Sequence, residues 1–273
     1  MYALDFDYDG KRLSDFGCII CDFDDTTGLD FISVGSQITF NTVQRNQGKI
    51  SSLTSAKYDS AIQSTFDICK DPKLCKVYAD KEFTDSECRD IIRWLNRREF
   101  KKLTILDDSD DIMDSRHFYA SFNVERIEIA KKVYGLRLTV ETNSPFAFGE
   151  TVRREFQFSS PTKGEKLIDI SDEIGFIYPN LIINCLGNGD LKLINETTNC
   201  NFYVKSCTTG EVITVNGDAR IISTNKDGHD ISGDFNYDFF NIQNTIDDRN
   251  NIIKASIPCK VMIEYEPIIK ASL

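Results

Sequence analysis

Apolar and polar residues alternate along much of this chain. In the segment FYASFNVE, Phe118, Ala120, Phe122 and Val124 occupy every second position, with polar residues between them. A period of two places these apolar side chains on one face, which predicts a half-buried antiparallel strand. The same pattern predicts further strands at QITFNTV (37–43), YGLRLTVE (134–141) and KVMIEYE (260–266).

Turn signals divide the strands into two blocks. Asp9-Gly10, Asn216-Gly217 and Asp227-Gly228 separate the strands at intervals expected of β-sandwiches. In NSPFAFGE (143–150) an alternating strand stops at a Pro- and Gly-flanked aromatic turn, and YPNLIINCLGNGDLKLIN (178–195) then indicates two strands around a hairpin loop. The pattern predicts a mainly β protein with an N-terminal domain over 1–147 and a second β-domain over 148–273, whose last strand can return toward the first.

One segment has the periodicity of a helix. In TDSECRDIIRWLNRREF, Thr84 and Glu87 have the spacing of a capping box, in which each side chain bonds the backbone of the other residue. Apolar residues then follow at i, i+3, i+4 and i+7, which predicts a helix whose apolar face packs on a sheet. These residues are Cys88, Ile91, Ile92 and Leu95.

Charge is distributed unevenly. The 273 residues include 32 basic and 43 acidic side chains, a net charge of −11, which argues against a general nucleic-acid binder. The segment 89–102 carries a net charge of +4 and the rest of the chain −15. This cationic segment either contacts an acidic surface or forms a solvated helix face whose cations suit a helix C-terminus.

No apolar run approaches the roughly 20 residues that span a bilayer, and the acidic N-terminus lacks a signal pattern, so folding in a cytoplasm without membrane insertion is expected. The nine cysteines are odd in number and irregularly spaced, which indicates reduced, buried thiols. Cys18 and Cys21 form a CxxC, but a strand would direct them to opposite faces. A zinc site needs four converging ligands and is not expected.

The segment CIICDFDDTTG resembles the first motif of haloacid-dehalogenase phosphatases, with Asp22 as nucleophile and Asp24 as acid/base. LTILDDSDDIMD, with Asp107 and Asp108, resembles that family's magnesium-binding pair. Such a site requires parallel strands joined by helical crossovers, and only one helix is predicted between the two motifs. Asp25 also replaces the family's usual Gly. A magnesium-dependent phosphatase is therefore a remote alternative, and the acidic runs are expected to be separate solvated loops that do not share one metal.

The order of segments resembles a different family, the siphophage distal tail proteins. FDYDGKRLSDFGCII, IIRWLNRREFKKLTILDD, RHFYASFNVERIE and GLRLTVETNSPFAFGE resemble the family's N-terminal domain. YPNLIINCLGNGDLKLIN, GEVITVNG and DFFNIQNTIDDRNNIIKASIPCKVMIEYEP are similar to its C-terminal domain. The resemblance therefore covers nearly the whole chain.

The resemblance implies a structural role without catalysis, metal or cofactor. It implies a homo-hexameric ring at the end of a phage tail tube, in which β-sandwich or barrel-like N-terminal domains, each with one helix, enclose a channel that DNA passes without specific binding. The C-terminal β-sandwiches, similar to galectins and carbohydrate-binding modules, would hold receptor-binding or baseplate proteins. Other implied partners are the tail tube protein and a tail-associated tip protein, in the tail of a virion assembled in the host cytoplasm.

Two sets of candidate contact residues follow. The cationic helix predicts an interface with a neighbouring subunit or the tail tube that includes Arg93, Trp94, Arg97, Arg98 and Lys101, with Trp94 either an interface anchor or a residue at the core edge. A carbohydrate-binding adhesion module is the alternative function, and its weak candidate contacts are Tyr237, Phe239 and Phe240. Because the alternation breaks at the Phe239-Phe240 pair, one of the two is expected to face outward and the other to join the core.

Overall fold

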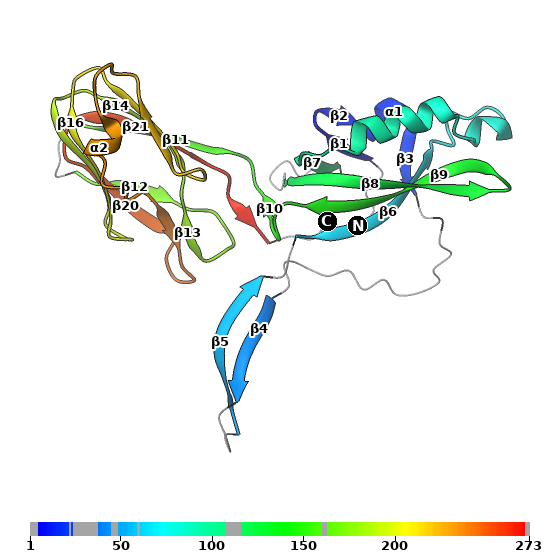
Figure 1. The fold of residues 1–273 in the computed structure, drawn as a ribbon, viewed down its shortest axis with the longest axis horizontal. Helices are drawn as coiled ribbons and strands as arrows, with labels where there is room; N and C mark the ends of the chain where they lie inside the picture. The colour runs from blue at the N-terminus through cyan, green and yellow to red at the C-terminus, as the bar shows by residue number, and fades with distance from the viewer. Residues whose placement is uncertain are drawn as a thin grey trace. The chain divides into compact units, whose positions relative to one another are not determined.

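The computed structural model describes residues 5–21, 23, 38–44, 49–58, 61–106, 116–159 and 163–270. The chain forms two compact units (Figure 1). The first comprises Met1–Gly149 with Ile269–Leu273, and the second comprises Glu150–Ile268. The expectation of a mainly β protein is confirmed, because strands dominate both units and the described residues contain one long α-helix and one short one.

A seven-stranded sheet forms the body of the first unit, in the order β2-β1-β7-β8-β9-β6-β3. Each pairing in this sheet is antiparallel. The strands are β1 (Asp5–Tyr8), β2 (Lys11–Arg12), β3 (Cys18–Cys21), β6 (Gln63–Lys70), β7 (Lys101–Leu106), β8 (Phe118–Ile129) and β9 (Lys132–Thr142). The alternation predicted for β8 is confirmed, since Phe118, Ala120 and Phe122 are buried.

Helix α1 (Asp85–Leu95) packs on β8 of this sheet. Its capping box forms as expected: the Thr84 hydroxyl accepts from the Glu87 N–H at 3.2 Å, and the Thr84 N–H donates to the Glu87 carboxylate at 2.7 Å. The buried face is Cys88, Ile91, Trp94 and Leu95, so the predicted face is shifted, with Trp94 buried and Ile92 only half-buried. Among its described residues, the first unit also contains two short 3-10 helices, η1 (Leu13–Phe16) and η2 (Tyr78–Lys81).

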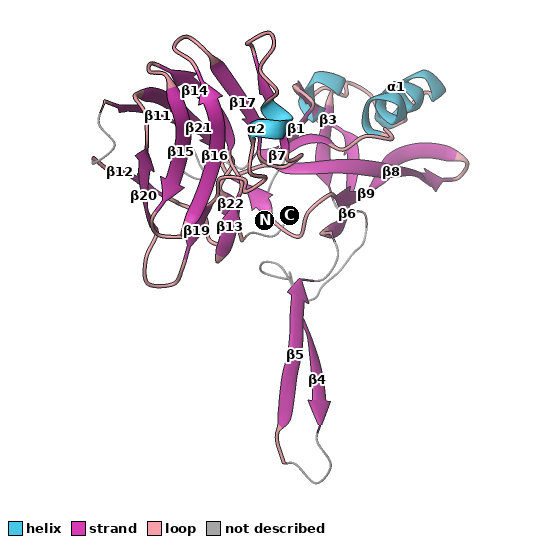
Figure 2. Cartoon of the chain, turned by 60° about the vertical axis from the view of Figure 1, so that its left-hand side comes forward, coloured by secondary structure: helices cyan, strands magenta, loops and turns pink. Residues whose placement is uncertain are grey.

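Strands β4 (Ile38–Gln44) and β5 (Ser51–Tyr58) form a separate antiparallel ribbon (Figure 2). Among the described strands these two pair only with each other. The expectation of a half-buried strand is wrong for β4, because Ile38 is 43% and Phe40 61% exposed. A two-stranded ribbon has no buried face unless another part of a protein packs on it.

The second unit is a β-sandwich. One sheet has the order β11-β21-β14-β17-β18 and the other the order β12-β20-β15-β16. Apolar side chains from both sheets fill the core between them, among them Leu181 and Val261 of the first and Leu193 and Phe202 of the second. The sandwich strands are β11 (Val152–Phe158), β12 (Glu165–Ile168), β14 (Asn180–Cys185), β15 (Gly189–Asn195), β16 (Cys200–Cys207), β17 (Val212–Asn216), β18 (Ile221–Thr224), β20 (Asn250–Ala255) and β21 (Cys259–Tyr265).

Strands β14 and β15 were expected to form a hairpin, and that expectation is wrong. Both strands exist, but β14 pairs with β17 and β21, whereas β15 pairs with β16 and β20. The chain crosses from one sheet to the other at 186–188, so each strand can bury its apolar face against the opposite sheet. The remaining elements are β10 (Ala147–Phe148), β13 (Gly175–Ile177), α2 (Ile231–Asp234), β19 (Ile242–Asn244) and β22 (Ile268–Ile269).

Candidate functional site

Three cations of the predicted interface, in and just after α1, differ in their exposure to solvent. Arg93 and Arg98 are exposed, and Lys101 at the start of β7 is half-buried. The Lys101 ammonium pairs with the Glu99 carboxylate at 2.8 Å. This hydrogen bond raises the pKa of Lys101, so the group stays charged. Among the cations of the predicted interface, Arg93 and Arg98 are therefore the most available to another molecule.

Arg97 is used mainly within its own unit. Its Nη1 donates to the Asp9 carboxylate at 2.7 Å, and its Nε donates to the carbonyl of Trp94 at 2.9 Å. The guanidinium also lies 5.9 Å from the ring centre of Tyr8. These contacts connect the end of α1 to the β1–β2 turn. Because Arg97 has these partners within its own unit, it is not a free cation.

Trp94 belongs to the core, with 4% of its surface exposed. Its ring stacks on Phe16 at 4.5 Å and on Phe6 at 5.6 Å, and its indole N–H donates to the carbonyl of Tyr8 at 3.0 Å. The interpretation of Trp94 as an exposed interface anchor is therefore wrong for this unit. Its ring and its N–H both have partners inside the first unit.

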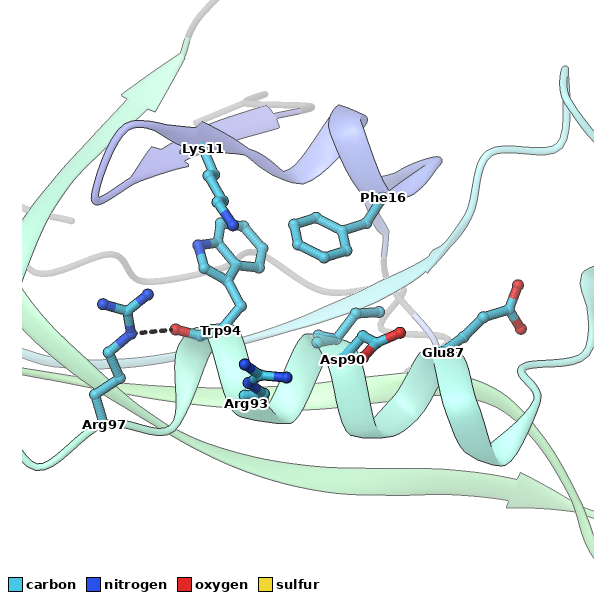
Figure 3. A pocket seen from close by; sticks show the side chains of 8 residues that line it. Lys11, Phe16, Glu87, Asp90, Arg93, Trp94 and Arg97 are labelled. Carbon is cyan, nitrogen blue, oxygen red and sulfur yellow. Dashed lines mark hydrogen bonds between the residues drawn. The ribbon is translucent and has the colours of Figure 1, made fainter.

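A hollow of about 480 Å³ lies between α1 and the β2–η1 segment (Figure 3). Its apolar lining includes Phe16, Ile91 and Trp94. Side chains of both charges surround this lining, namely Lys11, Glu87, Asp90, Arg93 and Arg97. Mixed charges around an apolar lining are typical of protein-contact surfaces, where a polar rim surrounds an apolar centre.

The β4–β5 ribbon exposes more apolar surface than any pattern in the sequence suggested. Phe40 is 61%, Val43 54% and Leu53 58% exposed, and Ile50 beside the ribbon is 82% exposed. Ile38 and Phe40 lie opposite Tyr58 and Ala56. One signal was available in the sequence: β5 reads SSLTSAKY, with a single large aliphatic residue, so the ribbon cannot form a core of its own.

The three aromatic residues proposed for sugar contact do not share one surface. Tyr237 is 68% exposed, and its hydroxyl donates to the carbonyl of Ser232 at 3.1 Å. Phe239 is half-buried against Phe235, with ring centres 5.0 Å apart. Phe240 is 2% exposed and belongs to the sandwich core, so it is excluded as a sugar contact. Phe240 is the core member of the Phe239-Phe240 pair, and Phe239 is partly buried and packs against the same core.

The phosphatase alternative lacks its structural frame. The strand CIIC is β3, which pairs antiparallel with β6, whereas the phosphatase site requires parallel strands. Asp22, Asp24 and Asp25 lie outside the described residues, as do Asp107 and Asp108, so their separation stays a prediction. Within the described ranges, no group of three or more His, Cys, Asp or Glu side chains has a geometry that could hold a metal ion.

The second unit contains a buried ion pair that sequence reasoning missed. His229 Nδ1 lies 2.5 Å from the Glu211 carboxylate, and the two side chains are 3% and 0% exposed. Burial alone would lower the pKa of His229, but the hydrogen bond and charge of Glu211 raise it. Glu211 also accepts from the Thr224 hydroxyl at 2.7 Å and from the Thr208 N–H at 3.0 Å. The pair joins the 226–230 segment to the turn before β17.

Comparison with known proteins connects both units to one biological setting. The family described as phage tail protein N-terminal domain matches residues 1–144, and the family described as phage tail C-terminal domain matches residues 146–265. The chain belongs to this phage tail protein family. The resemblance noted in the sequence is thereby confirmed at the level of the family.

A solved structure has a similar fold over nearly all of the chain. That structure is the Dit (gp 19.1) protein of phage SPP1, described as a paradigm of the hub adsorption apparatus in phages that infect Gram-positive bacteria, and it is similar with a TM-score of 0.66 and 14% identity. The similarity covers 96% of this chain and 98% of that protein. No curated protein matches the sequence. Of the helices that the structure describes, none combines the length and apolar character needed to span a membrane.

Proposed function

We propose that this phage tail protein is a distal tail protein that assembles into a homo-hexameric ring and joins the tail tube to the tip of the tail. In this proposal the first unit forms the ring and the second holds tip, receptor-binding or baseplate proteins. The family membership and the distal-tail fold support the assignment. A structural role of this kind requires neither catalytic residues nor a cofactor.

The exposed β4–β5 ribbon is the observation that carries the proposal. Its apolar side chains are about half exposed, and covering each one in an interface would contribute roughly 1 kcal/mol. A hairpin alone is marginally stable in water, and its strand edges offer unpaired N–H and C=O groups. A ribbon of this kind is expected to dock on another protein surface. In a ring of identical subunits, the neighbouring copy of the chain provides that surface.

A closed ring needs two different surfaces on each subunit, because each copy contacts the next head to tail. The ribbon provides one surface. The exposed cations Arg93 and Arg98, on a chain with a net charge of −11, provide a second surface that an acidic neighbour or the tail tube complements. A mostly acidic ring would also let DNA pass without binding, since few cations face its phosphates.

The test is the mass of the purified chain in solution, measured by mass photometry. The wild-type chain is expected at six times the monomer mass, and negative-stain images should show rings. The double variant Phe40→Ser with Leu53→Ser is expected to shift the population to monomers, because it removes the ribbon's apolar contacts. Charge reversal of Arg93 and Arg98 should weaken the ring as well; these residues are chosen because Arg97 holds Asp9 within its own unit.

Ile221→Ser is the matched control, because Ile221 is an equally exposed apolar residue (60%) on β18 of the second unit. It should leave the ring unchanged. The far-ultraviolet circular dichroism of every variant should match the wild type, so that loss of the ring is not mistaken for unfolding. A wild-type chain that stays monomeric, or a ribbon variant that still forms rings, contradicts the proposal.

A further inference from the structure

Two side-chain oxygen atoms in the second unit are buried and have no hydrogen-bond partner. They are Oδ2 of Asp169, which directly follows β12, and Oδ1 of Asn244, the last residue of β19. The two residues are 0% and 2% exposed. Buried polar atoms of folded proteins nearly always have partners, and a bound water or ion is a common explanation of an exception. Neither residue has a role in the tail-hub proposal.

Both side chains bond the backbone of Ser171, in the loop between β12 and β13. Ser171 donates to Oδ1 of Asp169 from its N–H at 3.1 Å and from its hydroxyl at 2.8 Å. The carbonyl of the same residue accepts from Nδ2 of Asn244. The Asp169 carboxylate and the Asn244 amide therefore come together at one residue of this loop, although they belong to segments about 75 residues apart in the chain.

Two backbone carbonyls fix the orientation of the Asn244 amide. Its Nδ2 donates to the Ser171 carbonyl and to the Glu173 carbonyl, the second at 3.4 Å. A reversed amide would place Oδ1 against these two carbonyl oxygens, where it could accept nothing. An ionised carboxylate is likewise only an acceptor. The two orphaned oxygens therefore lack the same thing, which is a donor or a positive charge.

The charge of Asp169 has no counterion in the part of the chain that the structure describes. No Lys, Arg or His side chain there lies within ion-pair distance of its carboxylate. The Tyr265 hydroxyl is near, since burial and then the charge of Asp169 raise the pKa of Tyr265. That hydroxyl donates to the Ile168 carbonyl at 3.5 Å, however, and not to Oδ2 of Asp169. A buried carboxylate without a cation is strongly destabilising, and a bound cation would remove this cost.

We propose that Oδ2 of Asp169 and Oδ1 of Asn244 bind a calcium ion. Both are hard oxygen donors, which suit Ca²⁺ or Mg²⁺ rather than zinc or copper. Ca²⁺ accepts carboxylate, amide and main-chain carbonyl oxygens in a flexible geometry, whereas Mg²⁺ keeps several of its waters. Side chains that are 0% and 2% exposed leave little room for such waters. With a single carboxylate, this site differs from clusters of three or more acidic, imidazole or thiol ligands, none of which occurs in the described ranges.

The ion has a structural consequence for the second unit. It joins the end of β12 to the end of β19 and so holds the loop 169–174, whose Ile170 and Ile174 are exposed. Because the affinity of a calcium site rises with the number of its charged ligands, one carboxylate indicates weak binding, with a Kd of about 10⁻⁴–10⁻³ M. An ion that binds only the folded chain also stabilises it against unfolding.

The test is a calcium titration of the full-length chain after its metal ions have been removed with EDTA. Isothermal titration calorimetry in about 150 mM KCl, which screens surface charges, should give a Kd of about 10⁻⁴–10⁻³ M. With about 10 mM CaCl₂ the thermal midpoint of the second unit should rise by about 5 °C above that of the metal-free protein. The same concentration of MgCl₂ should have a much smaller effect. No rise with calcium, or an equal rise with magnesium, overturns the proposal.

Two variants locate the ion. Asp169→Asn keeps an oxygen that accepts from Ser171 but removes the charge, so it should abolish the calcium-dependent rise in thermal midpoint. Without calcium it should be at least as stable as the wild type, because the uncompensated buried charge is gone. Asp247→Asn is the matched control, since Asp247 is an exposed carboxylate in the turn between β19 and β20, and it should keep the response to calcium. A response that persists in Asp169→Asn assigns the calcium to another part of this acidic chain and overturns the proposal.

A crystal structure of the wild-type protein grown with calcium identifies the occupant without relying on any variant. The expected result is an anomalous difference peak about 2.3–2.6 Å from both Oδ2 of Asp169 and Oδ1 of Asn244. A water at a hydrogen-bond distance of about 2.8 Å from these atoms, without an anomalous signal, overturns the proposal.

Discussion

The buried pair of Glu211 and His229 gives a sharp prediction for the stability of the second unit. Glu211→Gln keeps the volume of the side chain but removes its charge. The imidazole of His229 then stays in a site where its side chain is 3% exposed and where its charged form has lost its nearest partner. The variant should therefore be markedly less stable than the wild type.

The expected loss follows from the geometry of the pair. Removing one partner of a buried ion pair typically costs about 3–5 kcal/mol, because the other charge remains buried and uncompensated. Asp234 lies 3.3 Å from the other ring nitrogen of His229 and offsets part of this cost, which places the expectation near 3 kcal/mol. For a unit of about 120 residues such a loss lowers the thermal midpoint by about 10 °C.

The pH dependence has a definite sign. The pKa of His229 is raised above its unfolded value of 6.5, so its contribution to stability is complete below that pH and is lost as the pH rises through the folded pKa. The pKa of Glu211 is lowered despite burial, because Thr224 and His229 bond its carboxylate. Its contribution is present above the unfolded pKa of 4.5 and is lost as the pH falls through the folded value.

Scanning calorimetry across this pH range is the assay. The wild type should be most stable between the unfolded pKa values of Glu211 and His229, 4.5 and 6.5, and Glu211→Gln should lose the part of the alkaline decline that His229 contributes. Glu196→Gln is the control, because Glu196 pairs with Lys254 at the surface and such pairs contribute at most about 1 kcal/mol. Equal midpoints for Glu211→Gln and Glu196→Gln, or parallel pH profiles for Glu211→Gln and the wild type, would refute the reasoning.

Two further predictions concern packing. Trp94→Ala should destabilise the first unit by about 3–5 kcal/mol, because it removes the stacking on Phe6 and Phe16; a denaturant midpoint by circular dichroism near that of the wild type would count against it. Gly217→Ala should destabilise the second unit by at least about 1–3 kcal/mol, because the new Cβ would lie 1.8 Å from the backbone carbonyl oxygen of Tyr178; a calorimetric midpoint within experimental error of the wild type would show that the backbone relaxes freely.

Local signals in the sequence were sufficient to predict individual helices and strands. Thr84 and Glu87 predicted the start of α1 because a capping box acts within a single turn of helix. The alternation at Phe118, Ala120 and Phe122 predicted β8, because the side chains of a strand point to opposite faces in turn. The order of such segments over the whole chain was also enough to indicate the family.

The candidate surfaces depended on tertiary structure. Alternation in β4 shows which side chains share a face but not whether another layer covers that face, so Phe40 had the pattern of a half-buried residue and proved to be exposed. Trp94 lay one position beside the predicted apolar stripe, and only its packing against Phe6 and Phe16 placed it in the core. The periodicity of one segment contains no information about its neighbours in space.

The sequence by itself determined the class of fold, the helix, most strands and the phage tail family, because these follow from short-range periodicity and from the order of segments. Tertiary structure decided which strands pair, as with β14 and β15 in different sheets, and which distant side chains meet. Glu211 meets His229 because β17 and β18 pair antiparallel, which returns the chain after β18 to the turn before β17. Contacts of this kind join residues far apart in the chain, and no local pattern specifies them.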